Sequence, residues 1–203
     1  MRIEMYGELP GALRVQVEAL QDEAWPPEGE ATYGHDPLLR PRSMVLVDAD
    51  GRVLAALDLL FKTLHHAGEQ WRAAGLSAVV THPAARGRGH GRRLAEAART
   101  ALAEGTVPPD GRDPSGRAEP VAVEVGLFTC DRGLARFYRA AGWAELGGSV
   151  LVGGTPEEPF PSDRAGFDKV TMGAFFTDRA RAARPLFTSA RIGLYPGTID
   201  RLW

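Results

Sequence analysis

Cysteine is almost absent from this chain of 203 residues, with Cys130 as the single example. One thiol cannot build a disulfide framework or the thiolate set of a structural zinc site. No histidine spacing indicates a metal site either, so we expect no bound metal. Although a thiol just before a predicted helix can have a lowered pKa, nothing else marks Cys130 as a nucleophile.

Long apolar runs and an excess of basic charge are missing as well. No apolar stretch is long enough to cross a bilayer, and the opening MRIEMYGELPG has no apolar signal core. The formal net charge is −2, whereas nucleic-acid-binding domains usually carry a large basic excess. We therefore expect one cytoplasmic domain over residues 1–203, with no membrane and no nucleic-acid partner.

Hydrophobic periodicity predicts an α/β domain, because helical and strand-like segments alternate along the chain. The expected elements are a helix at 11–24, a β-hairpin at 43–64, a buried strand at 71–81, a helix of about four turns from Gly91, a strand at 121–128, a helix at 131–143 and closing strands at 143–153 and 169–176.

Other segments lack periodicity. Residues 104–120 are rich in Pro and Gly and are expected to form a surface loop insertion, and the tail 177–203 shows no clear element. In the helix at 131–143, Asp131 is the expected N-cap and Gly142 the expected stop. Leu134 is expected on its apolar face together with Tyr138.

The stretch HPAARGRGHGRRLAEAARTAL joins a predicted strand, a glycine-rich turn and a helix N-terminus. The first helical N–H groups lack internal partners and favour a bound anion, and glycines allow main chain to approach a phosphate. Arg86, Arg88 and Arg92 can add charge-assisted contacts. A dinucleotide fingerprint needs a glycine where Arg92 stands, and a P-loop needs Gly-Lys-Ser/Thr, so both are excluded.

The pattern R/Q-x-x-G-x-G/A is met by the six residues Arg86-Gly87-Arg88-Gly89-His90-Gly91. This segment resembles the acyl-CoA pyrophosphate loop of the GNAT superfamily of N-acyltransferases. DRGLARFYRAAGW resembles the second GNAT signature, a helix with a Tyr followed by Gly and an aromatic residue. Covering roughly residues 43–152, the resemblance implies an α/β GNAT fold: a mixed, mostly antiparallel sheet splayed between two strands, with helices on both faces.

The resemblance also implies an acetyl-CoA-dependent N-acetyltransferase that acts on a primary amine of a small molecule. Its pantetheine arm would pair with main chain near Val79, Val80 and Thr81, and the N–H of Val79 or Val80 would polarise the thioester carbonyl. Tyr138 matches the general acid that protonates the departing thiolate. The implied donor-binding residues are Val79, Val80, Thr81, Arg86, Gly87, Arg88, Gly89, His90, Gly91 and Arg92.

The general base is where the sequence departs from the family. Many GNAT enzymes carry a Glu on the strand before the loop, but Ser77 stands there, and a serine can only hold a water. Asp58 and Glu124 are the substitutes, because each is a carboxylate within an apolar strand. Taken singly, each is more simply explained by a sheet edge or an arginine partner, so the base stays unassigned.

The C-terminal half also resembles the aminoglycoside 2′-N-acetyltransferases, which makes an aminoglycoside one acceptor to test. The resemblance implies acidic substrate contacts at Asp36 and Asp200 and a terminal contact at Trp203. The missing strand glutamate and an arginine-rich tail speak against it. The alternative functions are a protein or peptide acetyltransferase and a non-catalytic acyl-CoA sensor. A homodimer is a family-level expectation, and the tail could serve as a dimerisation arm in which Leu194 and Trp203 pack on a partner.

Overall fold

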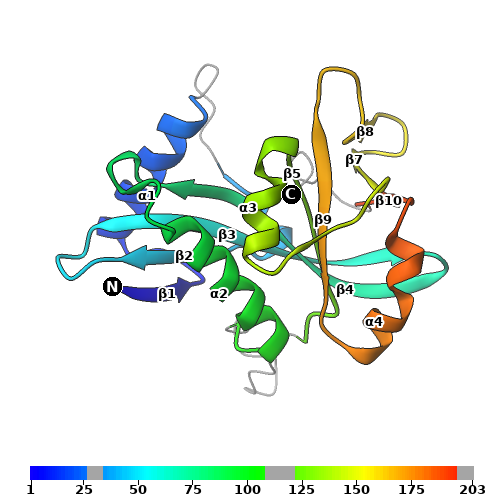
Figure 1. Ribbon diagram of the computed structural model, residues 1–203, viewed down its shortest axis with the longest axis horizontal. Helices are drawn as coiled ribbons and strands as arrows, with labels where there is room; N and C mark the ends of the chain where they lie inside the picture. Colours follow the sequence, from blue (N-terminus) through cyan, green and yellow to red (C-terminus); the bar gives the residue numbers. More distant parts are fainter. Residues whose placement is uncertain (27–33, 108–121, 196–203) are drawn as a thin grey trace.

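Two β-sheets organise the computed structural model, which describes residues 1–26, 34–107 and 122–195 (Figure 1). The seven-stranded sheet has the order β1-β2-β3-β4-β5-β9-β6, and the three-stranded sheet has the order β10-β7-β8. The strands are β1 (Arg2–Tyr6), β2 (Arg42–Val47), β3 (Val53–His66), β4 (Glu69–Thr81), β5 (Val125–Asp131), β6 (Ala144–Glu145), β7 (Val150–Gly154), β8 (Pro159–Pro161), β9 (Lys169–Phe175) and β10 (Arg191–Gly193).

Helices cover both faces of the large sheet, as predicted. On β2, Met44 and Leu46 belong to the core cluster that also contains residues of α2, whereas Val45 and Val47 pack with Val17 of α1. This alternation follows from the two-residue period of a strand. The helices are α1 (Gly11–Ala24), α2 (His90–Glu104), α3 (Ala135–Ala140) and α4 (Asp178–Ala183), with short 3₁₀ turns η1 (Pro37–Leu39), η2 (Pro83–Ala85), η3 (Arg132–Leu134) and η4 (Arg184–Phe187).

The sheet is mixed and mostly antiparallel, and it splays between β4 and β5. These two strands run parallel and share only two paired positions, Ala73 with Val125 and Ala74 with Gly126. Beyond them the strands separate toward the C-terminal end of β4. The predicted splayed sheet is therefore confirmed, and the gap opens beside the glycine-rich loop.

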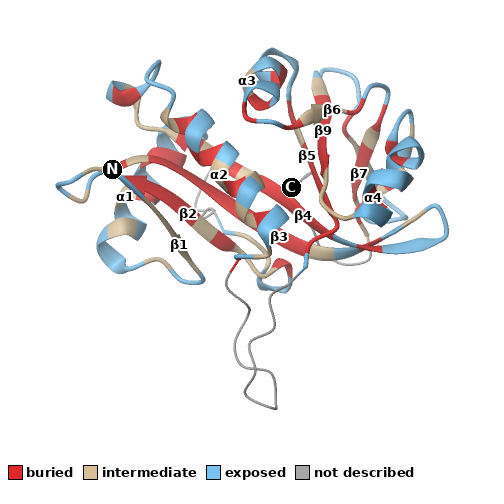
Figure 2. Ribbon diagram, turned by 60° about the horizontal axis from the view of Figure 1, so that its bottom comes forward, coloured by how far each residue is buried: buried red, intermediate tan, exposed pale blue. Residues whose placement is uncertain are grey.

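Helix α2 illustrates how the sequence pattern positions the loop. Leu94, Ala98 and Leu102 are buried at helical spacing against the sheet. Figure 2 shows this division, with the sheet-facing side of α2 buried and its outer side exposed. In the described ranges no helix is both long enough and apolar enough to cross a membrane.

Several predicted boundaries were wrong. The strand expected at 121–128 is β5, which begins only at Val125 and runs on to Asp131. The single strand expected at 143–153 is two strands, β6 and β7, in different sheets. They are separated by Gly148, whose φ of 72° turns the chain.

The helix expected at 131–143 is shorter, since η3 occupies its first turn and α3 only Ala135–Ala140. Asp131 makes no side-chain cap there; it pairs instead with Lys169 at 2.6 Å. Leu134 is 46% exposed rather than on the buried face. Of the loop expected at 104–120, Glu104 is the last residue of α2, and residues from 108 onward lie outside the described ranges.

The tail expected to lack structure contains α4, η4 and β10 up to residue 193. Thr177 caps α4 by accepting a hydrogen bond from the Ala180 N–H at 3.2 Å. Strand β10 pairs parallel to β7. Leu194 is fully buried within the chain's own core, so it cannot pack on a partner as the dimerisation-arm interpretation required.

Candidate functional site

The turn before α2 needs glycine at three positions for two reasons. Gly87 and Gly89 have φ values of 75° and 79°, a left-handed backbone that strains other residues. At Gly91 the reason is close packing, because an added Cβ would lie 2.6 Å from the Thr81 hydroxyl oxygen. The glycines therefore shape the turn and bring the start of α2 against β4.

This helix start leaves main-chain N–H groups without intrahelical partners. Gly89 is the N-cap and has no side chain with which to cap the helix. The Arg93 N–H is the first to bond back within this turn, to the Gly89 carbonyl at 2.9 Å. The preceding N–H groups of the helix have no intrahelical acceptor and favour negative charge. They belong to His90, Gly91 and Arg92.

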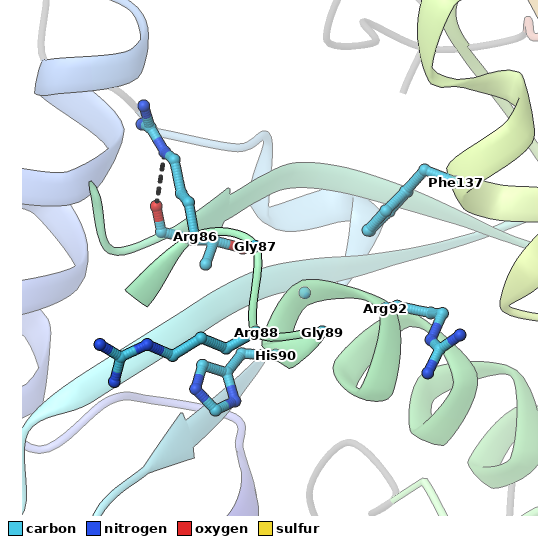
Figure 3. Close-up of a pocket in the computed structure, with 9 residues that line it drawn as sticks. Arg86, Gly87, Arg88, Gly89, His90, Arg92 and Phe137 are labelled. Carbon is cyan, nitrogen blue, oxygen red and sulfur yellow. Dashed lines mark hydrogen bonds between the residues drawn. The ribbon is translucent and has the colours of Figure 1, made fainter. Parts of the chain in front are cut away.

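A cavity of about 520 Å³ lies against this helix start (Figure 3). The arginine side chains do not converge on one point: Arg86 and Arg92 extend in different directions from the loop in Figure 3. The Arg86 guanidinium donates to the Thr81 carbonyl at 3.3 Å. The main chain thus provides the cradle, and the arginines surround it. The lining residues are Thr81, Arg86, Gly87, Arg88, Gly89, His90, Gly91, Arg92 and Phe137.

A second cavity of about 250 Å³ adjoins the first, since the two share Thr81, Arg86 and Phe137. It lies between the end of β4 and helix α3, with the last residue of α1 at one side. Its lining contains both Val79, the predicted oxyanion donor, and Tyr138, the predicted general acid. The lining residues are Ala24, Val79, Val80, Thr81, Arg86, Leu134, Phe137 and Tyr138.

A bulge in β4 sets the orientation of the main chain at this second cavity. Ser77 pairs with Asp58 and Val80 with Ala56, so two residues of β4 stand opposite one residue of β3. The first of the two, Ala78, has a φ of 49°. A bulged residue leaves the ladder and redirects its neighbours. Val79, the second of the two, therefore has its amide outside the regular β3–β4 pairing.

Tyr138 lies at the wall of this cavity in an aromatic environment. It is 6% exposed, and its ring meets those of Phe128 and Phe137 edge-on at 4.8 Å each. Burial, with the nearby Cys130 and Asp131, raises the pKa of Tyr138, so the phenol stays protonated at neutral pH. A protonated phenol is the form that a general acid requires.

Asp58 and Ser77 lie side by side on neighbouring strands. Residues paired directly across antiparallel strands have Cβ atoms roughly 5 Å apart and face the same side. Asp58 is 6% exposed, and its partners are Ser43 at 2.6 Å, His35 at 3.1 Å and Gln21 at 3.3 Å. The arginine partner considered for Asp58 is not among these contacts in the described residues. Instead, a buried polar cluster beneath α1 surrounds this carboxylate.

Glu124 lies elsewhere. Its carboxylate pairs with Arg179 at 2.7 Å and accepts the Arg72 N–H at 3.1 Å. Burial would raise the pKa of Glu124, but the Arg72 hydrogen bond and the Arg179 ion pair outweigh it and lower this pKa. Seven residues of strand separate Arg72 from Val79, roughly 20 Å. Glu124 therefore fastens α4 to the closed end of the β4–β5 pair, away from the cavity.

The predicted substrate contacts are only partly described. Asp36 is half-buried and caps η1 by accepting the Leu38 N–H at 2.9 Å. It also lies near enough to Lys62 to favour the charged form of that amine, although burial dominates and lowers the pKa of Lys62 to about 8. Asp200 and Trp203 lie outside the described residues.

Sequence reasoning missed His35. No spacing points to it, because its partners come from residues far away in the chain. The sequence offered a signal only at its partner Asp58. A carboxylate within an apolar strand needs hydrogen-bond donors, which must come from elsewhere in the chain.

The match to a family model places these features in context. The model of a GNAT acetyltransferase domain matches residues 6–108, just over half of the 203 residues. That range includes the glycine-rich turn and β4 but not Tyr138. No curated protein matches the chain.

Solved structures share the fold. An acyl-CoA N-acyltransferase from Pseudomonas aeruginosa is 18% identical with a TM-score of 0.52, over 85% of this chain and 99% of that chain. YhbS, a GNAT N-acetyltransferase from Escherichia coli in complex with CoA, is 14% identical with a TM-score of 0.54, over 96% and 90%. A variant of the spermidine N-acetyltransferase SpeG from Vibrio cholerae is 16% identical with a TM-score of 0.53, over 89% and 99%.

At these identities the likeness concerns the fold, whereas the family model rests on the sequence itself. Both agree with the splayed α/β fold. The chain therefore belongs to the GNAT acetyltransferase family and is an acyltransferase.

Proposed function

We propose that the protein transfers an acetyl group from acetyl-CoA to a primary amine of a small-molecule acceptor by direct attack on the thioester. One observation carries the proposal: a cavity lined by both Val79 and Tyr138 adjoins the main-chain anion site before α2. The anion site fits the pyrophosphate of the donor. The smaller cavity extends from Thr81 to the bulge at Val79, where the thioester would lie.

The residues have complementary tasks in this reaction. The amine lone pair forms the C–N bond at the thioester carbon while electrons move to oxygen, where the N–H of Val79 or Val80 stabilises the charge. When the carbonyl re-forms, the C–S bond breaks and the thiolate takes a proton from Tyr138. The phenolate is reprotonated from solvent, and the nitrogen gives its surplus proton to a base.

Among acceptors of this class, aminoglycosides are the first to test. The likeness of the C-terminal half to aminoglycoside 2′-N-acetyltransferases favours them, and a polycation suits an acidic contact such as Asp36. The proposal does not require a particular amine, and polyamines belong to the same chemical class. A sensor that binds acyl-CoA without transferring it is the alternative of a different kind.

The test is release of CoA thiol from acetyl-CoA in the presence of aminoglycosides, polyamines, amino acids and short peptides. Turnover with small amines is expected. Turnover with peptides alone would overturn the small-molecule acceptor, and binding of acetyl-CoA with no turnover of any amine would favour the sensor.

The variant Gly89→Glu tests the donor site. It places a carboxylate at the anion cradle and strains a left-handed backbone, so acetyl-CoA affinity measured by calorimetry should fall at least 100-fold, equal to about 3 kcal/mol. Gly166→Glu is the matched control, since Gly166 has a φ of 80° and open space around it, outside both cavities. Equal affinity of the two variants would contradict the assignment of the pyrophosphate loop.

A further inference from the structure

The larger and the smaller cavity meet at a place that we call the junction. Its residues are the three that line both cavities, Thr81, Arg86 and Phe137. A ligand that extends from the helix start of α2 into the cavity beside Val79 must pass these side chains. The chemistry of the junction therefore determines which groups a bound chain can have at this point.

Two of the three side chains meet at the first turn of α2. A Cβ built on Gly91 would lie 2.6 Å from the Thr81 hydroxyl oxygen and 3.4 Å from Cζ of Phe137. The hydroxyl and the ring are therefore at most about 6 Å apart. Gly91 also belongs to the helix start whose N–H groups lack intrahelical acceptors. The junction thus lies directly beside the place that suits a phosphate.

Phe137 contributes an apolar surface to the junction. Its side chain is half-buried and projects from α3 toward the glycine-rich turn (Figure 3). The ring is supported on a second side by Tyr138, which it meets edge-on at 4.8 Å. An apolar surface that lines a cavity gains free energy when a ligand covers it with apolar groups. The ring therefore favours a hydrocarbon portion of the ligand at this position.

Thr81 contributes a hydroxyl group. Its carbonyl oxygen already accepts the Arg86 guanidinium at 3.3 Å, and this arginine extends away from Phe137 in Figure 3. The hydroxyl makes no hydrogen bond within the described part of the chain. Since a hydroxyl can both donate and accept, it can pair with a hydroxyl of a ligand. The junction therefore combines an apolar group and a hydrogen-bonding group within a few ångströms.

CoA has matching groups in the same order. A methylene leads from its pyrophosphate to a carbon with two methyl groups, and the next carbon has a hydroxyl. We propose that Phe137 contacts the two methyl groups and that the Thr81 hydroxyl forms a hydrogen bond with the hydroxyl of the donor. The inference rests on the proposed acetyl transfer. It makes the junction a specificity determinant for donors with this branched segment.

Two ligands separate this role from a general effect on the donor site. CoA contains the branched segment, whereas adenosine 3′-phosphate 5′-diphosphate ends at the pyrophosphate. In calorimetry, Phe137→Ala should weaken CoA binding roughly tenfold because contact with the methyl groups is lost. Its affinity for the shorter ligand should stay within about twofold of the wild type. Equal weakening of both ligands, or of neither, would overturn the role of Phe137.

Two controls accompany Phe137→Ala. Phe137→Leu keeps an apolar side chain at the junction and should retain most of the CoA affinity. Phe167→Ala truncates another half-buried phenylalanine that lines neither cavity, so it should leave both affinities unchanged. A loss of CoA affinity in Phe167→Ala as large as that in Phe137→Ala would contradict a local contact.

The hydroxyl is tested by a pair of substitutions at Thr81. Thr81→Val removes the hydroxyl at nearly constant size and should weaken CoA binding roughly fivefold, the effect of one hydrogen bond. Thr81→Ser keeps the hydroxyl and should bind CoA nearly as the wild type does. Neither change should affect the shorter ligand. Unchanged CoA affinity in Thr81→Val, or a similar loss for both ligands, would overturn the proposed hydrogen bond.

The proposed function and this inference fail in different ways. If the wild-type protein acetylates no amine, the proposed function fails. If it acetylates an amine while Phe137→Ala and Thr81→Val bind CoA as tightly as the wild type, this inference alone fails.

Discussion

Replacing Tyr138 by Phe removes one oxygen from the wall of the cavity and leaves the rest of the aromatic packing in place. The ring keeps its edge-on contacts with Phe128 and Phe137, both at 4.8 Å. Within the described residues the Tyr138 hydroxyl makes no hydrogen bond that the change could break. Among the described residues this hydroxyl is not one of the buried polar atoms that lack a partner, so its removal should change the stability of the folded state little.

The catalytic effect should be far larger than the effect on stability. Loss of a general acid costs roughly 10²–10⁴-fold in rate, and at about 1.4 kcal/mol per tenfold that is about 3–5 kcal/mol of barrier. We therefore expect kcat to fall by this factor while the melting temperature and the acetyl-CoA dissociation constant stay near their wild-type values.

The assay is CoA-thiol release at saturating amine, with thermal unfolding and calorimetry on the same protein. Tyr6→Phe is the control, because Tyr6 donates to Glu4 at 2.6 Å on the edge strand β1, away from both cavities. A kcat of Tyr138→Phe within threefold of the wild type would refute the acid assignment. A large fall in melting temperature would show that the hydroxyl has a structural partner instead.

Two further predictions concern stability. Gly91→Ala should destabilise the fold by about 1–3 kcal/mol in urea unfolding and weaken acetyl-CoA binding, because the new Cβ would lie 2.6 Å from the Thr81 hydroxyl. Gly133→Ala is the control, because a Cβ at Gly133 would meet open space. Equal effects of the two substitutions would contradict the packing argument. Burial raises the pKa of Cys130 to about 11 and raises that of Tyr138 as well, so stability should be full below pH 9 and fall as the pH approaches 11. A flat unfolding free energy over that interval would count against it.

Local patterns predicted the elements on which the donor site is built. Helix α1 occupies the predicted residues 11–24, and the hairpin of β2 and β3 turns at the predicted DADG. Glycines and a helix N-terminus act through main-chain geometry over a few residues, so the glycine-rich turn at 86–91 and the helix after it could be predicted from a short motif. Its lining of the larger cavity follows directly from that geometry.

Elements that depend on long-range pairing were harder to predict. Strand β10 has three residues and forms because it pairs with β7, about 40 positions earlier. Helix α4 did have a readable signal, an N-cap Thr177 followed by Asp178, but a six-residue helix shows little periodicity. The tail therefore looked irregular although its side chains complete the core around Phe187.

The missing glutamate on β4 shows that a carboxylate can occupy nearly the same place from a neighbouring strand. A side chain at position 58 of β3 and one at position 77 of β4 project from the same face at roughly 5 Å, so a carboxylate on either strand reaches nearly the same volume. From β3 the carboxylate also meets hydrogen-bond donors of α1 and β2, and His35 Nε2 lies 3.1 Å from it. A sequence motif on β4 alone cannot predict that a carboxylate stands on β3 instead, because strand register, not sequence order, places positions 58 and 77 side by side.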